Sequence, residues 1–262
     1  MSQWRAALWV EALKARRSRM PWLTALGFSM APLAGGFFMV VLKDPAYARS
    51  MGLIGAKAQI TAGVADWPTY LGLLAQAIAV GGLLVFGLIA TWVFGREYAD
   101  RTAKDLLALP TSRAAIVGAK FAVVIGWCVA LAVLVFVLGL GIGMAIGLPG
   151  WSNRLALSGA STFVVTTGLT IALVTPVGFV ASAGRGYLPP MGFVILTLAL
   201  AQIVAVAGWG AFLPWAVAGL CSSIAGPQGE QANALSFALV MLTAAVGLLA
   251  TFAWWQYADQ VV

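Results

Sequence analysis

Six long stretches of the chain are almost continuous runs of apolar residues, and the segments between them hold nearly all of the charges. A membrane-spanning helix needs about 20 predominantly apolar residues, because the hydrocarbon core is about 30 Å thick and each residue rises about 1.5 Å. Runs such as residues 123–140 lack the alternation of barrel strands, so the spans are predicted to be helical. The pattern predicts an all-α polytopic membrane protein with spans at residues 21–42, 69–94, 115–147, 156–182, 188–210 and 234–256.

Two segments outside the spans carry their own patterns. Residues 1–20 predict an interfacial helix with Glu11 and Lys14 on one stripe and Trp4 and Trp9 on the other arc, its cations near anionic lipid. A short basic tail without fixed structure is the alternative. Residues 21–262 are predicted to form one six-helix domain. Within it, the segment 211–233 is predicted to be external, and its apolar stretch 212–220 is too short to cross, as in a re-entrant or interfacial element.

The composition excludes several functions. The chain is 62% hydrophobic and 9% charged, far from a soluble domain, and it has no histidine. Catalysis by a Ser-His-Asp or Cys-His arrangement and His-ligated metal sites are therefore excluded. No phosphate-binding loop of the Gly-x-x-x-x-Gly-Lys-Ser/Thr type is present, so we expect no ATP, no metal and no other cofactor on this chain.

The cations are distributed unevenly between the two sides. With alternating spans, eleven of the 15 lysines and arginines fall on the side that carries both termini. The other side has four: Lys43, Arg49, Lys57 and Arg154. Positive residues stay in the cytoplasm, so both termini are predicted to be cytoplasmic. This topology rule accounts for the net charge of +7, and no nucleic-acid partner is expected.

The segment between the second and third spans has the most informative pattern. Glu97 with Arg101, and Asp100 with Lys104, are acid-before-base pairs at the i,i+4 spacing that stabilises helices. Pro110 cannot continue such a helix. The pattern predicts a short amphipathic helix over residues 97–109, held between two membrane helices.

The same segment resembles a known family. Its Phe94, Glu97, Thr102, Leu106, Leu107, Pro110, Ser112, Arg113 and Lys120 follow the order of the cytosolic signature of ATP-binding-cassette (ABC) permeases of the second exporter type. That class includes bacitracin- and lantibiotic-export permeases. The family usually has glycine where this chain has Arg101. The layout of a basic elbow helix followed by six spans is also similar.

The resemblance implies a machine of several subunits in the bacterial cytoplasmic membrane. Two permease subunits, identical or similar, would form the pathway, and a separate ABC-type ATPase subunit would bind ATP and Mg²⁺. The cargo would be hydrophobic or amphipathic, such as peptide antibiotics, lipids or drugs. The helix over 97–109 would be the coupling helix that contacts the ATPase, through Glu97, Arg101, Thr102, Asp105, Leu106, Leu107, Pro110 and Arg113.

Neutral polar residues within the spans leave two interpretations open. Gln76, Thr166, Thr170 and Gln202 could line a weakly polar pathway, or they could form ordinary hydrogen bonds between helices. The alternative functions are an ATP-independent carrier or channel and, with less support, a membrane-embedded enzyme. No charge falls deep inside a predicted span, which argues against a proton-coupled carrier.

Overall fold

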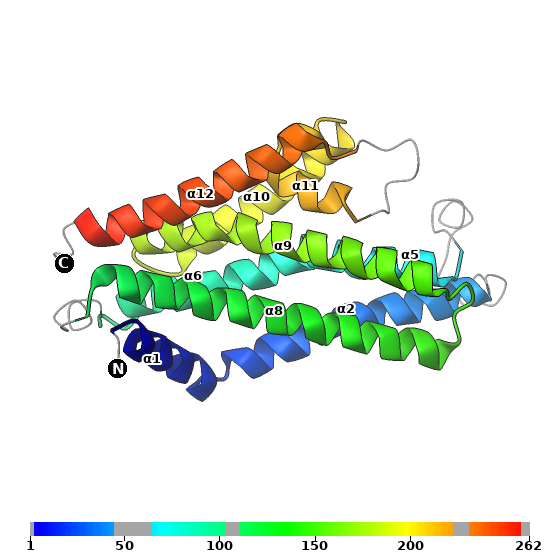
Figure 1. The fold of residues 1–262 in the computed structure, drawn as a ribbon, viewed down its shortest axis with the longest axis horizontal. Coiled ribbons are helices and arrows are strands. Elements are labelled where there is room, and N and C mark those ends of the chain that lie inside the picture. The colour runs from blue at the N-terminus through cyan, green and yellow to red at the C-terminus, as the bar shows by residue number, and fades with distance from the viewer. Residues whose placement is uncertain (1–2, 45–63, 103–110, 223–230, 258–262) are drawn as a thin grey trace.

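The computed structural model describes residues 3–44, 64–102, 111–222 and 231–257, and its long elements are all helices (Figure 1). Six helical segments are long and apolar enough to cross a membrane. They are α2 (Met20–Lys43), the segment Trp67–Ala99, α8 (Arg113–Ile146), α9 (Asn153–Ala183), α10 (Leu188–Val206) and α12 (Ala234–Tyr257). The predicted all-α polytopic membrane protein is confirmed.

The helix ends lie close to the predicted ones, and local capping explains two of them. The Asp66 carboxylate accepts a hydrogen bond from the Thr69 amide at 3.0 Å, and Ser112 Oγ accepts one from the Ala115 amide at 3.3 Å. Both are N-cap contacts that satisfy otherwise unpaired amides. The larger differences are that the second span continues to Ala99 and that α10 ends already at Val206.

The second span is interrupted in its middle by a wider turn. It consists of α5 (Trp67–Ala77), the π-helical turn η1 (Ile78–Gly82) and α6 (Leu83–Ala99). A π turn is an inserted residue accommodated within an α-helix, and such turns often occur at functional sites. The side chains of α5 and α6 therefore do not follow one continuous α-helical repeat.

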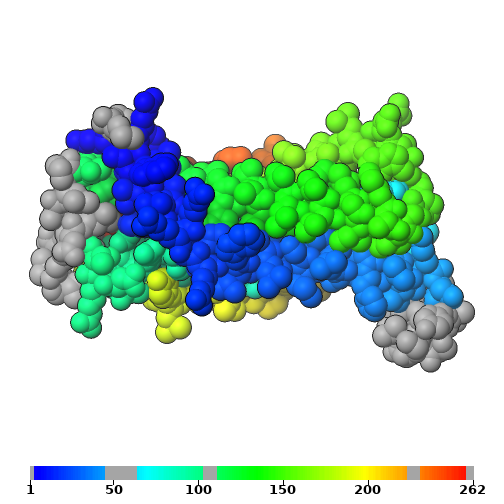
Figure 2. Space-filling model, turned by 90° about the horizontal axis from the view of Figure 1, so that it is seen from below, coloured from blue at the N-terminus to red at the C-terminus, as the bar shows by residue number. Residues whose placement is uncertain are grey.

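Helix α1 (Gln3–Arg17) lies across one end of the bundle, as Figure 2 shows. Its buried residues are Ala7, Glu11 and Ala15, whereas Trp9 is 66% exposed. A helix is thus present over most of the predicted range. Glu11 is buried against the protein and Lys14 is partly exposed, because both side chains find partners on two other helices, as described below.

Both ends of the described chain lie at the same end of the bundle (Figure 1). The Gln3 side-chain oxygen accepts a hydrogen bond from the Ser112 amide at 3.3 Å. The Arg113 guanidinium donates to the backbone carbonyls of Trp255 and Gln256 at 3.2 and 3.3 Å. The start of α1, the start of α8 and the end of α12 therefore meet.

The C-terminal half packs closely around α9. A Cβ atom on Gly247 of α12 would lie 2.5 Å from the backbone nitrogen of Pro176 in α9, so the two helices touch there. The Thr175 hydroxyl adds a hydrogen bond of 3.0 Å to the Ala244 carbonyl. The short elements η2 (Gly210–Phe212) and α11 (Pro214–Leu220) come from the segment that was predicted to be external, and α11 packs on α9, α10 and α12.

Candidate functional site

Four charged side chains from three helices meet near the end of the bundle that carries α1. We call Glu11 and Lys14 of α1, Glu97 of α6 and Lys120 of α8 the charge cluster. Lys120 Nζ lies 3.2 Å from Glu11 Oε2 and 3.0 Å from Glu97 Oε1. Lys14 Nζ lies 2.8 Å from Glu11 Oε1 and 2.7 Å from Glu97 Oε1. Each lysine thus bridges both carboxylates.

The cluster is withdrawn from solvent, and Lys120 most of all. The Lys120 side chain is fully buried, and its ammonium also donates to the Val93 carbonyl at 2.9 Å. It lies 6.0 Å from the ring centroid of Trp255, which brings α12 into the same site. Trp255 is itself buried and donates to Ser182 Oγ at 2.9 Å. The cluster therefore connects α1, α6, α8 and α12.

The two acids and two lysines balance in charge. Partial burial acts to lower the pKa of Lys14, but the carboxylates of Glu11 and then Glu97 outweigh it and raise the pKa above its ordinary value, so Lys14 is charged at neutral pH. A buried ion pair is a modest source of net stability, yet removing one partner leaves an uncompensated buried charge. The cluster therefore holds its helices in one arrangement.

The chain leaves the cluster through a tight turn. Helix α6 ends at Ala99, the Thr102 amide donates to the Glu97 carbonyl at 2.9 Å and the Arg101 amide to the Tyr98 carbonyl at 3.2 Å. These are the two hydrogen bonds of a Schellman C-cap. Arg101 has the left-handed φ of +57° that such a cap demands, in the position where the resembling family has glycine.

The prediction of one helix over 97–109 is therefore wrong at its start. Glu97 belongs to the last turn of the second span, and the chain is not helical from Asp100 to Thr102. Glu97 pairs with Lys14 and Lys120 and not with Arg101, because one partly buried and one fully buried ammonium group outcompete an exposed local partner.

The other predicted coupling residues have mixed placements. The Thr102 hydroxyl donates to Glu97 Oε2 at 2.8 Å, so it belongs to the cluster's edge. Arg113 begins α8 and joins it to the end of α12. The predicted residues Asp105, Leu106, Leu107 and Pro110 lie outside the described residues.

Sequence reasoning assigned no coupling role to Glu11, Lys14 or Lys120. The signal on α1 was the spacing of Glu11 and Lys14, which share one stripe of the predicted interfacial helix. Lys120 was visible as a cation inside an apolar run, two turns after the start of α8. A charge so placed requires a buried partner.

Two of the four candidate pathway residues line one cavity, which we call the glutamine cavity. Gln76 and Gln202 border a space of about 530 Å³ whose walls come from α5, η1, α10 and α11 and are otherwise largely apolar. Ser222 Oγ donates a short hydrogen bond to Gln76 Oε1. Thr166 and Thr170 lie apart from it, fully buried in α9, where the Thr170 hydroxyl donates to the Thr166 carbonyl at 2.8 Å.

Comparisons with known proteins show what the sequence of this chain is similar to. A family model described as ABC-2 family transporter protein matches residues 7–202. The bacitracin transport permease protein BCRB of Bacillus licheniformis is 30% identical over 179 residues, which cover 68% of this chain and 85% of that protein. No solved structure matches the chain. The region matched by the family model contains all four members of the charge cluster.

Proposed function

Because this chain belongs to the ABC-2 family of transporter proteins, we propose that it is the permease subunit of an ATP-driven exporter. A separate ABC-type ATPase subunit hydrolyses ATP with Mg²⁺, and a second permease subunit, identical or similar, completes the pathway. The observation that carries this proposal is the charge cluster, which binds four helices together directly before the segment that follows α6.

The proposed coupling depends on how both flanks of that segment are attached. On one flank, Thr102 is tied to Glu97 by side chain and backbone, and Glu97 to α1 and α8. On the other, Ser112 caps α8 and Arg113 joins it to α12. A displacement imposed by an ATPase subunit between these flanks is thereby transmitted to several helices at once.

We place this end of the bundle in the cytoplasm of a bacterial cell. The support is the uneven count of cations, most of which lie on the side of the two termini. The ATPase subunit is then on the side where ATP is available.

The glutamine cavity supports an amphipathic cargo. Its wall is mainly apolar, with the Gln76 and Gln202 amides as isolated hydrogen-bonding groups, which suits a molecule with large apolar parts and few polar ones. The similarity to a bacitracin transport permease makes peptide antibiotics the first cargo to examine. Within the second span the cavity is lined by residues of α5 and η1, so motion of α6 can reach it through that turn.

The test is reconstitution with the ATPase subunit that copurifies with the tagged chain. The variant with Leu106→Asp and Leu107→Asp is expected to lose ATPase binding and ATP-dependent bacitracin efflux, whereas Leu242→Asn, at an exposed site in the middle of α12, is expected to retain both. Unchanged ATPase binding and efflux in the double variant would refute coupling through this segment. Efflux from vesicles that lack any ATPase would favour the alternative, an ATP-independent carrier or channel.

A further inference from the structure

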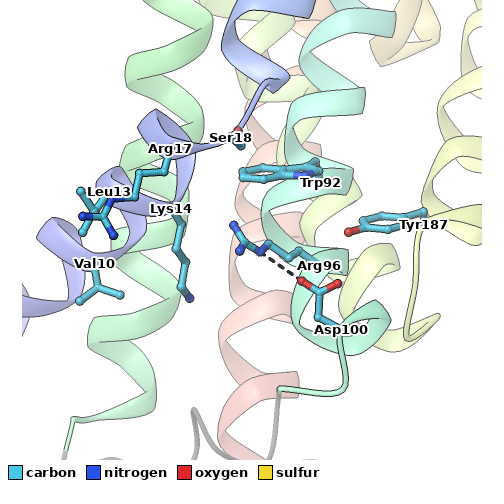
Figure 3. A pocket seen from close by; sticks show the side chains of 9 residues that line it. All are labelled: Val10, Leu13, Lys14, Arg17, Ser18, Trp92, Arg96, Asp100 and Tyr187. Atoms are coloured by element: carbon cyan, nitrogen blue, oxygen red, sulfur yellow. Dashed lines mark ion pairs between the residues drawn. The ribbon is translucent and has the colours of Figure 1, made fainter.

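A second polar site lies beside the charge cluster, between α1 and α6. This pocket, which we call the elbow pocket, has a volume of about 520 Å³. Three cations line it, Lys14 and Arg17 from α1 and Arg96 from α6, against the single carboxylate of Asp100 (Figure 3). Since Lys14 is already paired with two carboxylates, the two arginines carry the charge excess.

Arg96 is held where it can exchange partners. In Figure 3 its guanidinium extends from α6 toward α1, beside the face of Trp92, whose ring centroid is 5.1 Å away. Its Nε lies 3.4 Å from Asp100 Oδ2, and both side chains are partly exposed. Such an exposed pair is weak, whereas a phosphate group accepts two parallel hydrogen bonds from a guanidinium. An incoming phosphate can therefore compete for Arg96.

The turn between α9 and α10 supplies a neutral donor. Gly95 allows this turn to approach α6, because a Cβ atom there would lie 2.9 Å from the Gly186 carbonyl oxygen. The neighbouring Tyr187 points its hydroxyl toward the pocket (Figure 3). Burial, and then the nearby Asp100, raise the pKa of Tyr187, so the phenol keeps its proton at neutral pH.

The residues around the pocket are of the kinds that lie beside lipid headgroups. Val10 and Leu13 give it an apolar side along α1. The side chains of Trp9 in the middle of α1 and Trp22 at the start of α2 are 66% and 79% exposed, as tryptophans of the membrane interface are. A soluble phosphate gains nothing from these apolar neighbours, but a phospholipid does.

We propose that the elbow pocket binds the phosphate of an anionic phospholipid, whose acyl chains lie along the apolar surface of α1 and α2. Arg17 and Arg96 bind the phosphate oxygens, and Tyr187 donates to the headgroup. Basic pockets between membrane helices are suited to anionic headgroups. This lipid site does not rest on the proposed transport function, because all of its residues lie on this chain and lipid binding needs no ATPase subunit.

The experiment counts bound lipid on the purified full chain by native mass spectrometry after titration with phosphatidylglycerol or phosphatidylcholine. We expect preferential retention of phosphatidylglycerol. The double variant Arg17→Gln with Arg96→Gln is expected to weaken that binding by about fivefold for each arginine removed. The matched control is Arg5→Gln with Arg16→Gln, which removes the same charge from exposed sites of α1 that do not line the pocket and is expected to keep the preference.

Two further measurements identify the ligand and distinguish a loss of binding from a misfolded variant. The conservative variant Arg17→Lys with Arg96→Lys keeps the charge and is expected to show an intermediate loss, because lysine cannot bind a phosphate in a bidentate manner. Inorganic phosphate at millimolar concentration is expected to displace little lipid. Equal losses in the pocket and control variants, no preference between the two lipids, or full displacement by inorganic phosphate would each overturn the proposal.

Discussion

Lys120 Nζ in α8 lies 3.0 Å from Glu97 Oε1 in α6, and the Lys120 side chain has no exposure to solvent. This contact joins the two membrane helices that flank the proposed coupling segment. Removing either partner would leave an uncompensated charge in an apolar interior, so each helix depends on the other at this point.

Replacing Lys120 by methionine is expected to destabilise the protein by about 3–5 kcal/mol, because the two carboxylates then share only Lys14. Thermal unfolding in detergent, followed by circular dichroism, measures the change. Lys43→Met at the opposite end is the control, since Lys43 is exposed and contacts only the carbonyls of Ile146 and Gly147 among the contacts resolved for it. Equal effects of the two substitutions would show that the charge cluster does not hold the helices.

Replacing Arg101 by glycine is expected to stabilise the end of α6. A side chain in the left-handed region costs about 1–2 kcal/mol, and glycine adopts the observed φ of +57° without that cost. Arg101→Ala removes the same charge but keeps the Cβ atom, so it separates conformation from electrostatics. The glycine variant should unfold at a higher temperature than the alanine variant, and the reverse order would contradict the strained cap.

Gly247→Ala is expected to separate α12 from α9 and to cost about 1–3 kcal/mol, because its Cβ atom would lie 2.5 Å from the Pro176 nitrogen, which cannot move without the helix. The control is Gly168→Ala in α9, where a Cβ atom meets nothing within 4 Å and alanine favours the helix. Thermal unfolding compares the two. Similar unfolding temperatures would mean that the α9–α12 contact is not tight.

On the proposed function, Gln202→Leu is expected to reduce bacitracin efflux severalfold, because it removes an amide from the glutamine cavity. It leaves the charge cluster intact, so the basal ATP turnover of the assembled transporter is expected to stay unchanged. Thr170→Val, in buried α9 outside that cavity, is the comparison and is expected to change efflux less. Efflux and ATP hydrolysis are measured on the same proteoliposomes. A larger loss with Thr170→Val would move the pathway to α9.

The spans could be predicted from sequence because each one satisfies a local condition, an apolar run long enough to cross the bilayer. The caps at Asp66 and Ser112 were equally local. The end of α6 could not be predicted in this way. The i,i+4 spacing of Glu97 and Arg101 favours a helix locally, but Glu97 binds partners that are distant in the sequence. Lys14 and Lys120 lie far from Glu97 along the chain and meet it only after the helices pack.

The candidate site likewise combines residues that local patterns identify with residues that only the packing of the helices brings together. Glu97, Thr102 and Arg113 were found through the resemblance, which records residue order. Three features depend on how the helices pack: the burial of Lys120, the burial of Glu11 and the position of Gln76 and Gln202 on one cavity. A single sequence does not specify that packing. Hydropathy indicates which segments are buried in lipid but not which sides of them face protein.

The π-helical turn between Ile78 and Gly82 is a point at which the second span could change its twist. Each residue of an α-helix rotates the chain by about 100°. If these five residues tightened into regular α-helix, α6 would rotate by roughly that angle relative to α5. Glu97 lies on α6 and Lys120 on α8, so such a rotation would change the contact between them.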